Sequence, residues 1–243
     1  MIAARWGMLL VAALSILAAW GATSPAGQSS SLRVEVTAVI GLLAPLFWPG
    51  RAATGSRTAV RVVAWSAAAA ASAAIFLLAH PAQSWGRVAA ACAMLMAMLI
   101  VAHAVVATIE RRGHAAADGA ASARELAGPA MTGALAALGT LPFWLGPAAE
   151  ALSTRHPGII DVVVGLSPVT HLAVASGNDL LHNPWLYEHS NLAVLPVSYP
   201  ELGTLAWGYA TACVALAMIV LASRRARRTT SAIPIDPTQE QSR

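Results

Sequence analysis

The chain of 243 residues contains no lysine, and its two cysteines, Cys92 and Cys213, are too few for a disulfide framework. The missing lysine excludes a P-loop, because the loop that cradles nucleotide phosphates needs one. Charged residues make up only 11% of the chain, whereas soluble proteins contain about 25%. A soluble domain therefore does not fit this composition, and any ATP-driven process must take its energy from another protein.

The chain contains several long apolar stretches without charged residues. Apolar residues make up 57% of the chain, and a transmembrane helix needs about 20 of them in a row to cross about 30 Å of hydrocarbon. The charge-free runs are 6–32, 36–50, 62–86, 88–109, 126–149 and 202–223. We therefore expect one all-α integral membrane domain, residues 1–243. Its six predicted transmembrane helices lie at about 6–24, 34–49, 62–80, 88–109, 126–147 and 202–223.

The arginines predict the orientation of these spans. With both termini in the cytoplasm, twelve of the fifteen arginines fall in inner segments, and only Arg33, Arg87 and Arg155 fall outside. This bias is typical of the positive-inside rule. Most tryptophans also lie near predicted span ends, where we expect their rings to face the headgroups. Residues 1–25 are alternatively a signal peptide, whose removal would leave five spans in the same orientation.

The fifth predicted span is interrupted by helix-breaking residues. Gly128-Pro129 lies at its start, and Gly139, Pro142 and Pro147 lie farther along. Irregular backbone at membrane depth is tolerated only against protein or beside a water-filled cavity. We therefore expect the transport path or a hinge here, with Gly139, Pro142 and Pro147 as the candidate residues.

A large outer segment, 150–201, separates the fifth and sixth predicted spans. Within it, the apolar stretches 162–166 and 169–175 flank Ser167-Pro168, a pair typical of a helix start. The pattern predicts one or two short re-entrant or interfacial helices. The inner loop 110–125, by contrast, mixes charges of both signs and is expected to be solvated.

Two sets of polar residues are candidates for chemistry. His182, Glu188 and His189 in the outer segment are residue types that bind zinc or copper or act as an acid–base pair, but their spacing matches no established motif. A hydrogen-bonded structural role is the alternative for these three residues. His103 lies within the fourth predicted span, where an ionisable residue is a functional candidate. A backbone carbonyl is the expected partner of its ring, and no cofactor is predicted.

The basic cytoplasmic tail, 224–243, begins next to the last predicted span. Such a cluster beside a span binds anionic lipid headgroups, at about 1 kcal/mol per basic residue. We expect this role for Arg224, Arg225, Arg227 and Arg228, and we expect no nucleic-acid partner, because no soluble binding domain accompanies them.

The layout and the closing region resemble the type-2 permease subunits of ATP-binding-cassette transporters. The sequences LPFWLGPAAEAL (141–152) and GLSPVTHLAVASG (165–177), followed by a final span that ends in arginines, are similar to the closing region of that family. Ser167 stands where the family more often has Asn. The resemblance implies a pair of permeases, as a homodimer or heterodimer, with a separate nucleotide-binding ATPase. Arg51, Arg57 and Arg61 would then contact the ATPase.

The leading hypothesis is thus a multi-pass permease subunit of an ATP-driven exporter in a bacterial inner (plasma) membrane. Two alternatives remain open. One is an outer-facing multi-pass membrane enzyme or metal-binding protein that uses His182, Glu188 and His189. The other is a non-catalytic membrane subunit of a larger envelope or respiratory complex.

Overall fold

The computed structural model describes residues 37–48, 57–78, 84–113, 120–156, 158–179 and 198–231, and every regular element in these ranges is a helix. The predicted all-α fold is thus confirmed for this part of the chain, while the predicted first span, 6–24, lies outside it. Helical residues 37–43 lead into η1 (Ala44–Phe47). The helices that follow are α3 (Arg57–Leu78), α4 (Trp85–Gly113), α5 (Ala120–Gly139), α6 (Leu141–Ser153), α7 (Ile159–Gly165), α8 (Pro168–Ser176) and α10 (Leu202–Ser231).

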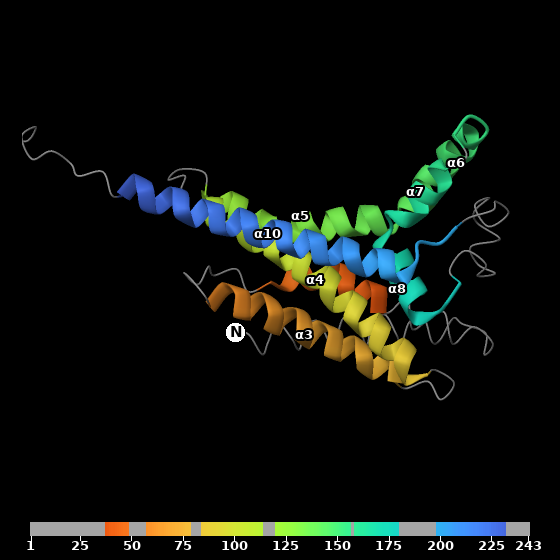
Figure 1. Cartoon of the computed structure of the whole chain (residues 1–243), viewed down its shortest axis with the longest axis horizontal. Helices are drawn as coiled ribbons and strands as arrows, with labels where there is room; N and C mark the ends of the chain where they lie inside the picture. The colour runs from red at the N-terminus through yellow and green to blue at the C-terminus, as the bar shows by residue number, and fades with distance from the viewer. Residues whose placement is uncertain are drawn as a thin grey trace, which may run out of the picture.

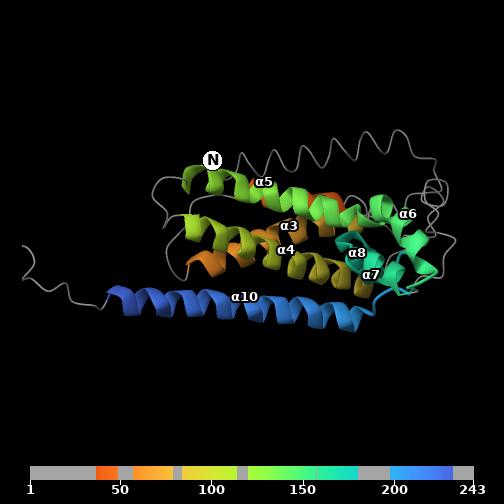
Figure 2. The same ribbon diagram turned by 90° about the horizontal axis from the view of Figure 1, so that it is seen from above.

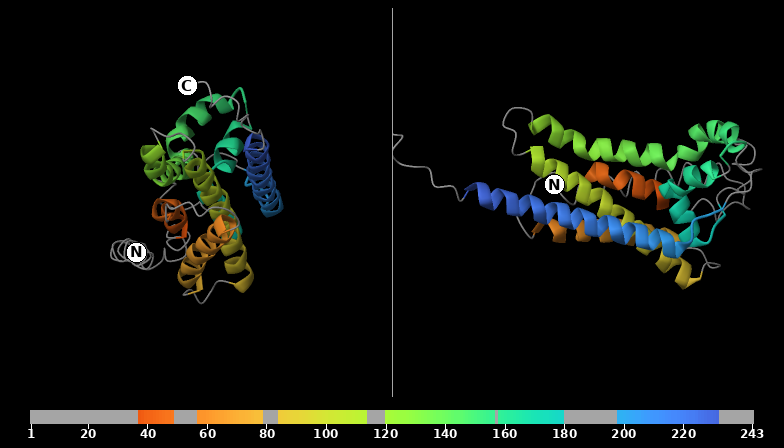
Figure 3. Two further views of the ribbon diagram at one scale, coloured as in Figure 1. Left: turned by 90° about the vertical axis from the view of Figure 1, so that its left-hand side faces the viewer. Right: turned by 45° about the horizontal axis from the view of Figure 1, so that its top comes forward.

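Four long helices, α3, α4, α5 and α10, run along the same direction and form an elongated bundle (Figures 1 and 2). α4 is the central member, because it packs against α3, α5, α8, α10 and η1. The short helices α6, α7 and α8 gather at the end of the bundle where α4 and α10 begin (Figure 3). α6 and α7 project away from the long helices there (Figure 1).

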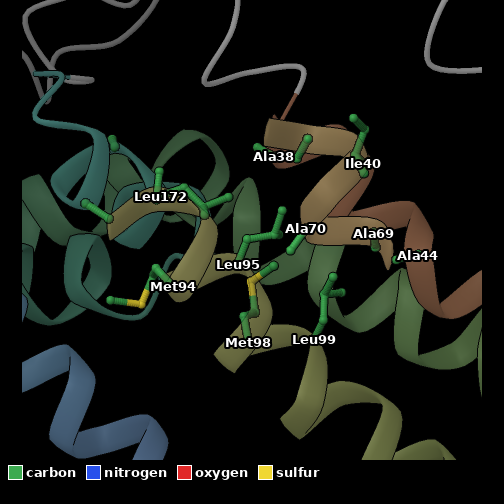
Figure 4. Close-up of a cluster of buried hydrophobic side chains, with 14 of the residues drawn as sticks. Ala38, Ile40, Ala44, Ala69, Ala70, Met94, Leu95, Met98, Leu99 and Leu172 are labelled. Atoms are coloured by element: carbon green, nitrogen blue, oxygen red, sulfur yellow. The ribbon is translucent and has the colours of Figure 1, made fainter. Parts of the chain in front are cut away.

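The largest core cluster lies where α3, α8 and residues 37–44 meet α4 (Figure 4). α3 contributes small residues, Ala69, Ala70 and Ala73, so its backbone can approach α4 closely. Leu95 and Leu99 of α4 are fully buried in this contact. Close approach also explains a glycine in the second predicted span: a Cβ at Gly41 would lie 2.6 Å from Cδ1 of Leu95.

A second cluster fills the other end of the bundle and contains two tryptophans. Trp48 and Trp65 are each 7% exposed and pack with Val62, Val106 and other apolar residues. The prediction that these two rings face lipid headgroups is therefore wrong. Both rings fill space between helices, and Trp48 also has a polar partner inside the bundle.

Two helices are long and apolar enough to cross a membrane: Trp85–Glu110 of α4 and Leu202–Ile219 of α10. α7 and α8 together form a third candidate, although the chain bends by 80° between them. The apolar parts of the remaining helices, Thr37–Leu46, Thr58–Ala74 and Leu126–Gly139, are shorter. The described residues are thus all-helical and contain two or three helices that could span a membrane, and six spans remain a prediction.

The interruptions predicted from proline and glycine are present only in part, because α5 continues through Gly128-Pro129 and α6 continues through Pro147. The second predicted span changes from α-helix to 3-10 helix at Ala44, just before Pro45. The fifth is interrupted at Thr140, between α5 and α6, and α6 then extends to Ser153, beyond the predicted end at 147. Ser167 and Pro168 begin α8 as expected, so the outer segment contains two short helices.

Candidate functional site

The most unusual backbone arrangement of the described chain is a meeting point of two helix interruptions. The first is Thr140, which separates α5 from α6, and the second is the bend between α7 and α8. The Ser167 hydroxyl donates a buried hydrogen bond of 3.0 Å to the carbonyl oxygen of Gly139. This carbonyl is in the last turn of α5, where helical carbonyls commonly take part of their hydrogen bonding from outside the helix. One interruption thus supplies a hydrogen-bond donor to the other, and we call this pair of residues the junction.

Packing at the junction is tight around position 139. A Cβ on Gly139 would lie 3.1 Å from Cγ2 of Val169 and 3.5 Å from both terminal carbons of Leu42. Of the three hinge candidates, Gly139 therefore lies at the point where helices from three parts of the chain meet. Pro142 occupies the first turn of α6, where its missing N–H costs no helical bond.

Pro147 lies farther along, inside α6, and is exposed. Because proline has no N–H, the carbonyl four residues earlier lacks its helical donor. The structure therefore brings Gly139 to the junction, next to the start of α6 at Pro142, while Pro147 lies elsewhere on α6.

α8 is connected to α10 through the ring of His171. Nε2 of His171 lies 2.7 Å from the carbonyl oxygen of Gly165, and Nδ1 lies 2.8 Å from the hydroxyl of Tyr209. A carbonyl oxygen only accepts, so Nε2 carries the proton and donates to Gly165. In the neutral ring, Nδ1 then accepts a hydrogen bond from Tyr209. The two rings also meet edge to face, with centroids 5.6 Å apart.

The end of α8 is closed by a glycine that needs its conformational freedom. Gly177 has a φ of 69° and donates to the carbonyl oxygen of Val174, while Asn178 donates to that of Ala173. These two bonds form a Schellman motif, which glycine at this position permits without strain. A Cβ there would also lie 2.8 Å from the guanidinium carbon of Arg87, so the arginine lies beside the negative end of the α8 dipole.

The residues that precede α10 are connected to α7 and to the end of α8. The backbone N–H of Ser198 donates to Asp161 of α7 at 2.9 Å, and the Tyr199 hydroxyl donates to Asp179. With the His171–Tyr209 bond included, residues 198–209 thus make three hydrogen bonds to α7, to α8 and to the segment that follows α8. The first part of α10 is therefore positioned by the short helices.

A second polar group lies inside the opposite half of the bundle. His103 is fully buried, its Nδ1 lies 3.0 Å from the hydroxyl of Ser66, and its ring stacks on Trp48 with centroids 5.0 Å apart. The same indole donates from Nε1 to the carboxylate of Glu110 at 3.1 Å. His103 and Glu110 are seven residues apart, two turns of α4, so Trp48 spans two positions on one face of that helix.

A backbone carbonyl is the expected partner of His103, and the structure gives its ring a serine hydroxyl in addition to the nearby backbone of Ala44. Nε2 of the ring has no hydrogen-bond partner among the described residues. The expected solvation of the loop 110–125 is wrong for its first residue, because Glu110 is 3% exposed. The sequence does contain a signal for this polar group around Trp48. His103 and Glu110 are the only ionisable residues on α4 between Arg87 and Arg111 other than Cys92.

The other predicted site residues are distributed as follows. His182, Glu188, His189 and Arg51 lie outside the described residues. Arg57 is the first residue of α3, and Arg61 is exposed one turn later. The tail arginines 224, 225, 227 and 228 lie in the last turns of α10, so the predicted tail begins as a continuation of the sixth predicted span.

Sequence reasoning missed the side chains that connect α10 to the bundle. His171 is not among the candidates that the sequence analysis names, and nothing in the sequence pairs it with Tyr209, which is 38 residues away. No family model, curated protein or solved structure matches this chain. We therefore infer the function from the geometry of this molecule and the chemistry of its residues.

Proposed function

We propose that this chain is a membrane transport protein, and specifically the permease subunit of an ATP-driven exporter that is energised by a separate ATPase. The observation that carries the proposal is the junction of two interrupted helices, through Ser167 and Gly139. Interrupted helices that meet inside a membrane protein are typical of transport paths, because irregular backbone there needs protein or a lined cavity around it. The missing lysine supports a separate source of ATP hydrolysis.

In this proposal both termini are cytoplasmic, the membrane is a bacterial inner membrane, and two permease subunits form the pore. α6, α7 and α8 then cover the outer end of the path, and Gly139 is the hinge between the cover and α5. Apolar packing as well as polar contacts holds the cover in place, because α8 packs Leu172 into the main core cluster and α6 and α7 share a smaller apolar cluster. In this proposal α6 and α7 move relative to the long helices, while α8 keeps its packing on α4.

The inner ends of the helices would face the ATPase. Arg51, Arg57 and Arg61 are the proposed contacts, and Arg61 is exposed on the first turns of α3. Charged residues at such an interface determine which partner binds and how fast, so reversing one charge weakens association. Arg155 in the exposed turn after α6 is the matched control, because it lies at the opposite end of the bundle.

Copurification tests this proposal. The tagged chain is extracted from its native membrane in mild detergent, and nucleotide-binding proteins recovered with it are identified and assayed for vanadate-sensitive ATP hydrolysis. We expect an ATPase in the preparation, reduced several-fold by Arg61→Glu and unchanged by Arg155→Glu. A stable preparation without any ATPase would contradict the proposal. Bound zinc or copper that is lost on substitution of His182 and His189 would favour the membrane-enzyme alternative.

A further inference from the structure

The attachment of α10 to the rest of the molecule buries few of its side chains. Among the eighteen residues Leu202–Ile219, only Leu205 is buried, and large apolar side chains such as Trp207 and Val214 are exposed. Inside a membrane, exposed apolar residues meet lipid, so no hydrophobic force drives α10 onto the bundle. Its association must then depend on van der Waals contact and on hydrogen bonds between helices.

Only one side-chain hydrogen bond that joins α10 itself to another helix is present among the described residues. It is the bond from Tyr209 to Nδ1 of His171, and the edge-to-face contact of the same two rings reinforces it. The bonds of Ser198 and Tyr199 belong to the segment before the helix begins. Tyr209 also packs against the main core cluster, so the bond lies where α10 comes closest to that core.

The acceptor in this bond is preorganised by a second bond. Gly165, at the end of α7, accepts from Nε2 of His171 and thereby leaves Nδ1 as the acceptor that faces Tyr209. The carbonyl that sets the tautomer belongs to the last turn before the 80° bend. A change in the bend between α7 and α8 would therefore move Gly165 relative to His171 and weaken the bond to α10.

We infer that His171 and Tyr209 form a latch that holds α10 on the bundle, and that the bend between α7 and α8 controls it. When the latch is closed, α10 lies against α4 and α8. When it opens, the outer third of α10 separates laterally while α3, α4 and α5 keep their packing. The junction bond from Ser167 to Gly139 connects the same bend to α5, so a movement of α5 relative to α6 reaches α10 through α8.

Distance measurements between two spin labels test the latch without an ATPase or a substrate, so the result is independent of the proposed function. Cys92 and Cys213 are replaced by alanine, and labels are placed at Gly86→Cys on α4 and Gly203→Cys on α10. A Cβ at either glycine meets no atom within 4 Å, so the labels should not disturb packing. The labelled protein is reconstituted in lipid nanodiscs and measured by double electron–electron resonance.

Two substitutions of His171 separate its two hydrogen bonds. The Asn side chain places its amide near the position of Nδ1, so His171→Asn keeps an acceptor for Tyr209. The Gln side chain reaches the position of Nε2, so His171→Gln keeps only the bond to Gly165. Tyr209→Phe removes the hydroxyl and retains the ring. Thr108→Val is the control, because it removes a hydroxyl that bonds only within α4.

We expect one narrow distance distribution for the parent protein, for His171→Asn and for Thr108→Val. We expect an additional, longer and broader component for Tyr209→Phe and for His171→Gln. The loss of one variant through misfolding leaves the other to report, since both delete the same bond. A parent protein that already has the broad component would overturn the inference. So would any set of distributions that does not follow the presence of the Tyr209 bond.

Discussion

The two helices that are long enough to cross a membrane differ sharply in how they are packed. In the membrane-crossing stretch of α4, 44% of the residues are buried inside the protein, whereas in that of α10 the value is 6%. α4 contacts most of the other helices, and its Leu95 and Leu99 are among the large side chains that are fully buried. α10 contacts α4 and α8 and is otherwise exposed.

This difference indicates two different roles for helices of similar length and composition. A helix that fills the centre of the bundle determines how the other helices pack, and its side chains are constrained on all sides. A peripheral helix in lipid is stabilised by its own backbone hydrogen bonds and by the few contacts that reach the bundle. We therefore interpret α4 as the fixed element and α10 as the element that moves.

The largest expected difference comes from removing side-chain volume. Leu95→Ala in α4 should lower the free energy of unfolding by about 2–5 kcal/mol, because it leaves a cavity in the main core. Met218→Ala in α10 removes a side chain that is 63% exposed, so its effect should be less than about 0.5 kcal/mol. Steric trapping in lipid bicelles measures both. Equal losses would contradict the distinction between the two helices.

Much of this comparison was predictable from the sequence, but not the part that concerns contacts. Charge-free length predicted both α4 and α10, because the cost of burying charge in lipid acts on each residue locally. Ser167-Pro168 predicted the start of α8, because a cap and a proline act on the first turn alone. In contrast, the burial of Trp48 and Glu110 depends on residues 62 positions apart. No local pattern encodes the contact between Trp48 and Glu110. The sequence therefore predicts that the Trp48 ring faces the lipid headgroups, although this ring fills the core.

The next largest expected difference in stability comes from adding a methyl group at a glycine near α4 or on α10. Gly41→Ala would place a Cβ 2.6 Å from Leu95 and 2.8 Å from Met98. Both contacts are with the ends of side chains that can shift, so we expect a cost near the lower end of the range of about 1–3 kcal/mol for overpacking. Gly208→Ala on α10 has open space and should be neutral or stabilising by up to about 1 kcal/mol, because alanine is the better helix former. Thermal unfolding of both variants, followed by circular dichroism in nanodiscs, measures the difference. A stabilising Gly41→Ala would show that residues 37–43 do not pack on α4.

The buried polar group on α4 predicts a loss of similar size. Trp48→Phe keeps an aromatic ring beside His103 but removes the donor to Glu110, which should cost about 1–3 kcal/mol. Glu110→Gln retains an oxygen acceptor for the indole and should cost less. The same unfolding assay ranks the two variants, and the reverse order would mean that the carboxylate charge, rather than the indole bond, stabilises this site.

The smallest expected effect concerns the junction. Ser167→Ala removes one hydrogen bond to Gly139, and interhelical hydrogen bonds in membrane proteins contribute about 0.6 kcal/mol on average. Ser167→Thr keeps the hydroxyl and is the control. Hydrogen exchange of the α5–α6 and α7–α8 segments, measured by mass spectrometry, should rise for the alanine variant only. If exchange in the alanine variant is unchanged at both interruptions, the Ser167–Gly139 bond does not couple them and the prediction is wrong.

The central claim is that α4 and α10 cross the membrane, with the end of the bundle that carries α6, α7 and α8 facing the outer side. Single cysteines at the exposed positions Gly158 and Ala59, in a protein without Cys92 and Cys213, test it by labelling with a membrane-impermeant maleimide in intact cells. The account predicts that Gly158→Cys is labelled at once and that Ala59→Cys is labelled only after the membrane is permeabilised. Labelling of both positions from outside, or of Ala59→Cys alone, would contradict it.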